Sequence, residues 1–220
     1  LSHIKETYPE YIPCVLLQMT LVAFSDIIQI AREWNSDGLL KSFVLSNIHG
    51  LSPNFINGVK TVDYEETKQL YLHILDAYEK HQDWVVLKIF LDECLAYWKD
   101  RPIIDAGQSV PMATCMPINS KIYIDSQMQI GICEKVADKY RIGNVKNGID
   151  WKRANEIVEE YYHKRVERCK YCPAIRMCDM CLTAVEYSDE QWDILCHNER
   201  VYAQIFMFLY CEMAERGLIK

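Results

Sequence analysis

The stretch RCKYCPAIRMCDMC, residues 168–181, places four cysteines within fourteen residues. Thiols this close together form disulfides, a zinc site or the ligands of an iron–sulfur cluster. A soft metal or cluster needs several thiolates that converge on it, and a C-x2-C turn points two sulfurs at one centre. The spacing continues to a fifth thiol as Cys169-x2-Cys172-x5-Cys178-x2-Cys181-x14-Cys196.

The composition argues against a framework of disulfides. The chain has 220 residues, of which ten are cysteine and half are hydrophobic. Disulfide-dense proteins are usually small and secreted, because their cores are too small to hold them together. A chain of this length can bury a core, and the polar opening LSHIKETYPEY lacks the features of a secretion signal. We therefore expect a cytoplasmic protein with reduced thiols.

Charge and hydropathy limit the kinds of partner that the chain is expected to bind. The formal net charge is −7, and the chain has no basic run, although HKRVERCK (163–170) is locally positive. This balance argues against nucleic-acid binding, which needs a basic surface. No apolar run reaches the ~18 residues that a membrane span requires, so we expect no membrane partner.

The first hundred residues alternate strand and helix patterns. A helix is expected over 1–12, a buried strand over 14–22, a helix from Ser25 or Asp26 to Asp37, and a second buried strand over 42–48. Strand, helix and strand at this spacing predict a βαβ unit of an α/β fold. Two helices follow, the first after a capping box at Asp63 and Glu66 and the second over about 84–99.

The pattern changes near residue 101, where the stretch RPIIDAGQSVPMAT contains Pro and Gly, lacks periodicity and is interpreted as a linker. We therefore predict two domains, 1–100 and 101–220. In the second, KIYIDSQMQIGIC alternates polar and apolar residues and predicts a β-hairpin that turns at 125–128. RIGNVKNG reads as a loop, Asp150 caps a helix through about His163, and a last helix is expected over 198–216.

Two further cysteines belong to this constellation, because Cys115 precedes the hairpin and Cys133 ends it. Seven thiols exceed what one four-coordinate site can use, so two sites are expected. Structural zinc usually has a longer gap between its C-x2-C pairs than the five residues here, which favours iron–sulfur clusters without excluding zinc.

The second half of the chain resembles the SPASM domain of radical SAM peptide maturases. The resemblance lies in TCMPINSKIYIDSQMQIGICEK, YRIGNVKNGID, CKYCPAIRMCDMC and Cys196. Residues 1–100 resemble the last βα units of a radical SAM partial (β/α)6 barrel, mainly in their strand–helix order. The resemblance implies an α/β fold in which this barrel portion precedes an α+β SPASM domain with a β-hairpin and cysteine-rich loops.

The resemblance also implies two auxiliary 4Fe–4S clusters. The distal cluster would be bound by Cys169, Cys172, Cys178 and Cys196, and the cluster nearer the active site by Cys115, Cys133 and Cys181. The sequence departs from the family at Pro117, which is not soon followed by Gly, and at Met128, which stands where the hairpin turn usually has Gly. Because Met adopts a positive φ with difficulty, we expect a longer turn of another type.

The radical chemistry of the family belongs to a C-x3-C-x2-C motif, which this sequence lacks. Because the chain opens at Leu1 within a helical pattern, we expect that motif upstream, and the given residues alone to be inactive. The full-length enzyme would use S-adenosylmethionine and a third 4Fe–4S cluster to modify a ribosomally made precursor peptide, with a flavodoxin or ferredoxin as reductant.

Glu134, beside Cys133, is a weak candidate for a catalytic base. The alternative is a zinc-binding, cysteine-rich interaction domain on an α/β scaffold.

Overall fold

The computed structural model describes residues 6–7, 18–21, 26–38, 40, 45, 47–50, 60–99, 122–133, 138–175, 177–178 and 180–219. The chain divides into two compact units. Unit 1 comprises residues 1–100 with 204–220, and unit 2 comprises residues 101–203. Residues 204–220, expected in the second domain, thus belong to unit 1. The helix predicted over 1–12 and the linker after residue 101 lie largely or wholly outside the described residues.

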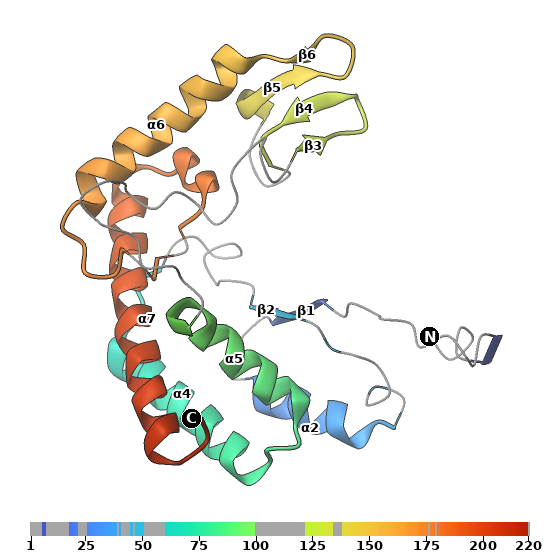
Figure 1. Ribbon diagram of the computed structural model, residues 1–220, viewed down its shortest axis with the longest axis vertical. Coiled ribbons are helices and arrows are strands. Elements are labelled where there is room, and N and C mark those ends of the chain that lie inside the picture. Colours follow the sequence, from blue (N-terminus) through green and yellow to red (C-terminus); the bar gives the residue numbers. More distant parts are fainter. Residues whose placement is uncertain are drawn as a thin grey trace. The chain divides into compact units, whose positions relative to one another are not determined.

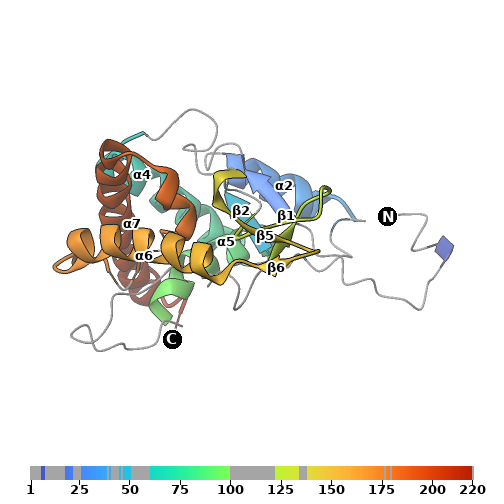
Figure 2. The same ribbon diagram turned by 90° about the horizontal axis from the view of Figure 1, so that it is seen from above.

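The strands of unit 1 form the predicted βαβ arrangement. Strand β1 (Gln18–Leu21) pairs in parallel with β2 (Asn47–Gly50), and α2 (Ile27–Ser36) connects them. Helix α2 packs against α5 (Val85–Lys99), which also contacts β2 (Figures 1 and 2). Helix α2 buries Ile27, Ala31 and Trp34, which recur at the spacing of one helical face. Strand β2 begins later than the predicted 42–48, so only its first two residues fall within that range.

The longer helices of unit 1 also follow the sequence. Helix α4 (Tyr64–Lys80) begins where predicted, because the Asp63 side chain accepts a hydrogen bond of 2.8 Å from the Glu66 backbone N–H. Helix α5 (Val85–Lys99) buries Leu87, Leu91 and Leu95 on one face. Tyr71 of α4 stacks on Phe90 of α5, with ring centroids 5.8 Å apart. The core of unit 1 is therefore apolar and aromatic.

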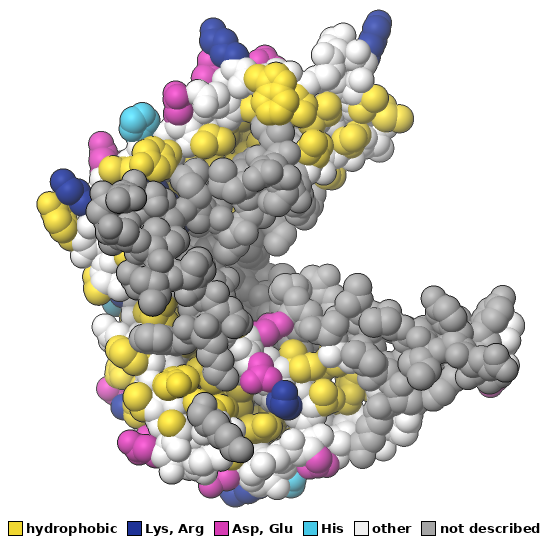
Figure 3. Space-filling view, in the orientation of Figure 1, with side chains coloured by type: hydrophobic (Ala, Val, Ile, Leu, Met, Phe, Trp, Pro, Cys, Tyr) yellow, Lys and Arg dark blue, Asp and Glu magenta, His cyan; other side chains and the backbone are white. Residues whose placement is uncertain are grey.

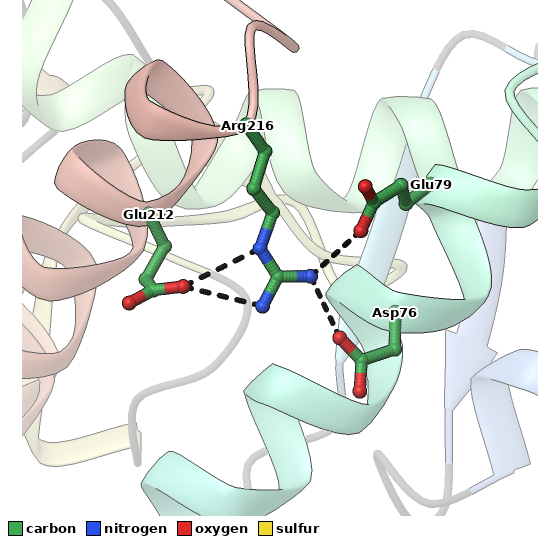
Figure 4. A network of polar contacts seen from close by, with 4 residues as sticks. All are labelled: Asp76, Glu79, Glu212 and Arg216. Atoms are coloured by element: carbon green, nitrogen blue, oxygen red, sulfur yellow. Dashed lines mark hydrogen bonds and ion pairs between the residues drawn. The ribbon is translucent and has the colours of Figure 1, made fainter.

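A cluster of charges fixes the end of the last helix, α7 (Asp189–Glu215), within unit 1. Arg216 donates to Asp76 Oδ1 at 2.7 Å and to Glu79 Oε2 at 2.9 Å, both on α4 (Figure 4). It also pairs with Glu212, one turn earlier in α7. These three carboxylates raise the pKa of the Arg216 guanidinium and tie the C-terminal turn of α7 to α4.

Unit 2 contains a four-stranded antiparallel sheet in the order β3-β4-β5-β6. Strands β3 (Tyr123–Ile124) and β4 (Gln129–Gly131) form the predicted hairpin. The interpretation of RIGNVKNG as a loop is wrong, because β5 (Arg141–Asn144) and β6 (Gly148–Ile149) form a second hairpin there. This second hairpin requires glycine at position 143 of β5, because a Cβ there would lie 2.1 Å from the carbonyl oxygen of Gly148 on β6.

The turn of the first hairpin also differs from expectation. Met128 occupies the left-handed region with φ of 60°, so the turn is not lengthened to avoid this conformation. The Met128 backbone N–H donates to the Asp125 carbonyl at 3.0 Å, which closes a four-residue turn. The Asp125 carboxylate also accepts from the backbone N–H groups of Gln127 and Gln129, at 2.8 and 2.9 Å. These bonds hold a strained methionine where the resemblance predicts glycine.

Helix α6 (Trp151–Cys169) connects the sheet to the cysteine-rich segment (Figure 1). Its cap at Asp150 is as predicted, with a bond of 3.0 Å from the Arg153 N–H to the carboxylate, but it continues past His163 to the first cysteine of the cluster. Helix α7 likewise begins before the predicted residue 198, so Cys196 is helical. The buried face of α6, the sheet and the cysteine-rich segment share one hydrophobic core that includes Ile142, Tyr161, Cys178, Met180 and Trp192.

Large apolar side chains are also exposed at the sheet end of unit 2, where Figure 3 shows hydrophobic atoms gathered around β3–β6 and the start of α6. The members of this exposed group are Ile122, Tyr123, Ile124, Met128, Val145 and Trp151.

Candidate metal centre

Six of the seven predicted ligands lie within the described residues, and all six are in unit 2. None of the eight cysteines that the structure describes forms a disulfide. Cys115 and the candidate base Glu134 lie outside the described residues. Cys169, Cys172, Cys178, Cys181 and Cys196 lie around the C-terminal end of α6, the segment after it and the second turn of α7.

The structure brings three of the predicted distal ligands together. Cys169 is the last residue of α6, and the Cys172 backbone N–H donates to its carbonyl at 3.0 Å, which forms the tight turn of the first C-x2-C pair. Cys196 on α7 interacts electrostatically with both thiols. Burial, together with these two thiols, raises the pKa of Cys196 to about 11, because a thiolate there would be desolvated and repelled. Burial also raises the pKa of Cys169.

The second C-x2-C pair is held against α6 by Met180, one of the two residues between its thiols. The Met180 carbonyl accepts from the Tyr161 hydroxyl at 2.7 Å and from Arg165 Nη1 at 2.8 Å. Tyr161 interacts electrostatically with Cys178 and Cys181. Cys178 is buried and Cys181 is half-buried, so this segment presents two thiols at different depths beside one helix. The hydrogen-bonded carbonyl fixes the backbone between them.

Cys133 lies two residues after β4, at the end of the first hairpin. Its half-buried side chain packs against the hydrophobic core of unit 2 and lines a polar pocket beside the hairpin. Arg141, in the same pocket, pairs with Asp125 and Asp138 at 2.9 Å each. Because Cys115 is outside the described residues, the structure does not test the predicted set of Cys115, Cys133 and Cys181.

Three arginines surround the distal thiols. Arg165 and Arg168 on α6 favour the thiolate of Cys169, and Arg168 and Arg200 favour that of Cys196. Arg168 also pairs with Asp189 and Asp193, which fixes the start of α7 to the end of α6. Arg165 lies in the locally positive run 163–170, and its burial was not predicted from the sequence. Its spacing of four residues from Tyr161, on the stripe that contains Ile157 and Ala154, could have indicated that it faces the core.

The residues present fit a soft, thiolate-bound centre by donor type. The distal thiols lie near cations, and two nitrogens of the buried Arg165 have no hydrogen-bond partner among the described atoms. No group of three or more described Cys, His, Asp or Glu side chains is arranged to hold a metal ion. The described thiols therefore lie near one another but are not arranged as the ligands of one metal ion.

Comparison with protein-family models, curated proteins and solved structures gives no match. No helix within the described ranges has the length and apolar character needed to cross a bilayer. The resemblance to SPASM domains therefore rests on the residues of this chain.

Proposed function

We propose that this chain is the C-terminal part of a radical SAM peptide maturase, in which unit 2 binds two auxiliary 4Fe–4S clusters. The observation that carries the proposal is the ordered set of seven cysteines, three of which, Cys169, Cys172 and Cys196, interact around the ends of two helices. Thiolates are the usual protein ligands of such clusters. The parallel βαβ arrangement of unit 1 is compatible with the last units of a partial barrel.

The distal cluster would be held by Cys169, Cys172, Cys178 and Cys196, and the second cluster by Cys115, Cys133 and Cys181. When bound, the clusters supply electron transfer or a binding site for the peptide. The protein itself would bring the thiols together and exclude water from them. Because burial raises the pKa of Cys169 and of Cys196, binding must displace protons that these two thiols retain in the metal-free protein at neutral pH.

The complete enzyme would bind S-adenosylmethionine at a third 4Fe–4S cluster, held by a C-x3-C-x2-C motif upstream of Leu1. It would modify a ribosomally made precursor peptide by a thioether, carbon–carbon or related bond, with an electron from a flavodoxin or ferredoxin. Glu134 is the candidate base. We place this chemistry in the cytoplasm, where the thiols stay reduced. The 220 residues alone would not cleave S-adenosylmethionine, which 5′-deoxyadenosine formation under dithionite would test.

The first experiment measures iron, sulfide and zinc in protein produced and purified without oxygen. Two clusters predict about eight iron atoms per chain, with a brown colour and broad absorption near ~400 nm. Stoichiometric zinc without iron in a colourless protein would instead support a zinc-binding interaction domain. The same measurement therefore decides between the two functions.

The assignment of ligands is tested by Cys178→Ala and Cys181→Ala. The two residues are three positions apart, yet the proposal places them in different clusters. Each variant should lose about half of the iron, and electron paramagnetic resonance should show that a different cluster is lost in each. Loss of the same cluster in both variants would contradict the division. Cys211→Ala is the control, because Cys211 is an exposed thiol of unit 1.

A further inference from the structure

Arg165 is the one fully buried charged side chain among the described residues, with 0% of its surface exposed. It lies on α6, one turn after Tyr161 and one turn before Cys169. A guanidinium is always protonated in proteins, so its charge cannot be removed by losing a proton. Burying an unpaired charge is strongly unfavourable, and natural proteins therefore provide a partner for it.

The partners that the structure shows are neutral. Arg165 Nη1 donates to the Tyr161 hydroxyl at 2.7 Å and to the Met180 carbonyl at 2.8 Å. Nε and Nη2 are buried and find no hydrogen-bond acceptor within the described part of the chain. Two directed donors and a full positive charge are therefore left without compensation by the described atoms.

The groups that interact electrostatically with this guanidinium are Tyr161, Cys178 and Cys169. None of them is a carboxylate, and within the described residues Arg165 forms no ion pair. The two cysteines belong to the proposed distal set. As thiols they are neutral and cannot offset the charge, whereas as metal-bound thiolates they are anionic and accept N–H hydrogen bonds.

We propose that Arg165 is the internal counter-cation of the distal thiolate centre, and that its Nε and Nη2 groups donate hydrogen bonds to sulfurs of that centre. The inference rests on the proposed function only in requiring that a thiolate-bound centre forms at Cys169, Cys172, Cys178 and Cys196. The nearby charge and the N–H···S bonds stabilise the more negative, reduced state of a cluster. Arg165 thus raises the potential at which the distal cluster accepts one electron from a reductant.

The test is a dithionite titration of the fully loaded chain, followed by electron paramagnetic resonance. Arg165→Met should shift the midpoint potential of one cluster to a more negative value and leave that of the other unchanged. Arg165→Lys should shift it less, because it keeps the charge but loses the planar fork. Arg153→Met, at the opposite end of α6, is the matched control and should leave both potentials as in the wild type. A purely structural role would change stability and not the potential.

A second measurement uses protein labelled with ¹⁵N in its arginine side chains. The wild type should show a guanidinium ¹⁵N hyperfine coupling to the reduced distal cluster that is missing from Arg165→Lys, which distinguishes Arg165 from Arg168 and Arg200. Unchanged potentials in Arg165→Met, or the absence of that coupling, would overturn the inference while leaving two clusters and the proposed function intact.

If the wild-type chain holds zinc and no iron, the proposed function fails and the inference is decided by zinc release. Faster transfer of zinc to a chelator from Arg165→Met than from Arg153→Met would support a counter-cation of the thiolate site. Equal rates of transfer from the two variants would overturn it.

Discussion

Cys94 in unit 1 and Cys196 in unit 2 are both helical thiols, and burial raises the pKa of both, to about 12 and about 11. Their neighbours differ. Cys94 lies in the apolar face of α5, where its side chain is hydrogen-bonded to Tyr71. Cys196 faces two further thiols and the guanidinium groups of Arg168 and Arg200. A raised pKa therefore does not distinguish a core thiol from a ligand, whereas the presence of other thiols and cations does.

The same difference extends to the two cores. Unit 1 is built from apolar and aromatic contacts, and its arginine cluster lies at the surface of α4 and α7. Unit 2 buries a guanidinium beside its thiols and leaves two of its donors without a described partner. We infer that unit 1 is stable by packing alone, and that unit 2 gains stability from whatever its thiols bind.

The largest expected effect distinguishes the proposed ligand Cys196 from the core thiol Cys94. Cys196→Ala should reduce the iron content by about half and destabilise unit 2, because ligation supplies part of its folding free energy. Cys94→Ala should keep all of the iron and cost about 1 kcal/mol through the small cavity left in α5. Iron analysis and urea unfolding of both loaded variants are the measurements. Loss of iron from Cys94→Ala would show that Cys94 is not merely a core thiol and would contradict the distinction from Cys196.

The next effect concerns the pH dependence of unit 1. Burial favours the protonated thiol of Cys94, so its pKa rises from 9.0 in the unfolded chain to about 12 in the folded protein. Below pH 9 both states hold the proton and stability is unaffected, whereas between pH 9 and about 12 only the folded state does. Keeping a proton that the unfolded chain releases weakens folding, so stability falls over this window. Urea midpoints should fall less steeply with pH in Cys94→Ala than in wild type, and identical slopes would contradict the assignment.

A smaller effect is expected at the surface of unit 1. Arg216→Ala removes one cation from three carboxylates and should destabilise the chain by about 1 kcal/mol, the upper range for exposed pairs that form a network. Lys88→Ala, which breaks the isolated pair with Asp92 on α5, should cost only about 0.3 kcal/mol. Thermal unfolding at low and high salt measures both, and the difference should shrink as salt screens the charges. Equal losses would show that the network adds nothing to a single pair.

The smallest effect is expected in the first hairpin of unit 2, where one substitution should increase stability without changing any thiol. Met128→Gly should stabilise the hairpin by about 0.5 kcal/mol, because glycine adopts a positive φ without steric cost and the exposed methionine packs against little. Gln127→Gly, at a neighbour whose φ is not positive, is the control and should destabilise it. Unfolding of the metal-free chain gives the comparison, and a loss of stability in Met128→Gly would show that its side chain contributes more than its strain costs.

The elements that the sequence predicted are those set by short-range interactions. The caps at Asp63 and Asp150 are bonds to a backbone N–H three residues away, and the apolar periodicity of α4 and α5 is likewise local. The second hairpin was missed although Asn147-Gly148 is a strong turn signal, because the whole of RIGNVKNG was interpreted as a loop. The spacing of C-x2-C pairs also sets the turn between Cys169 and Cys172, so half of the distal site is encoded locally.

The sequence by itself determined the positions of most helices and of the first hairpin, and the order of seven cysteines in the second half of the chain. Only the tertiary structure brought Cys196 to Cys169 and Cys172, because that contact depends on how α7 packs against the end of α6. The same packing withdrew Arg165 from water, although an arginine in a basic run is usually solvated. Local sequence patterns determine the backbone hydrogen bonds of helices and hairpins. The burial of a side chain instead depends on which helix and sheet faces pack together, and residues far apart in the chain decide that packing.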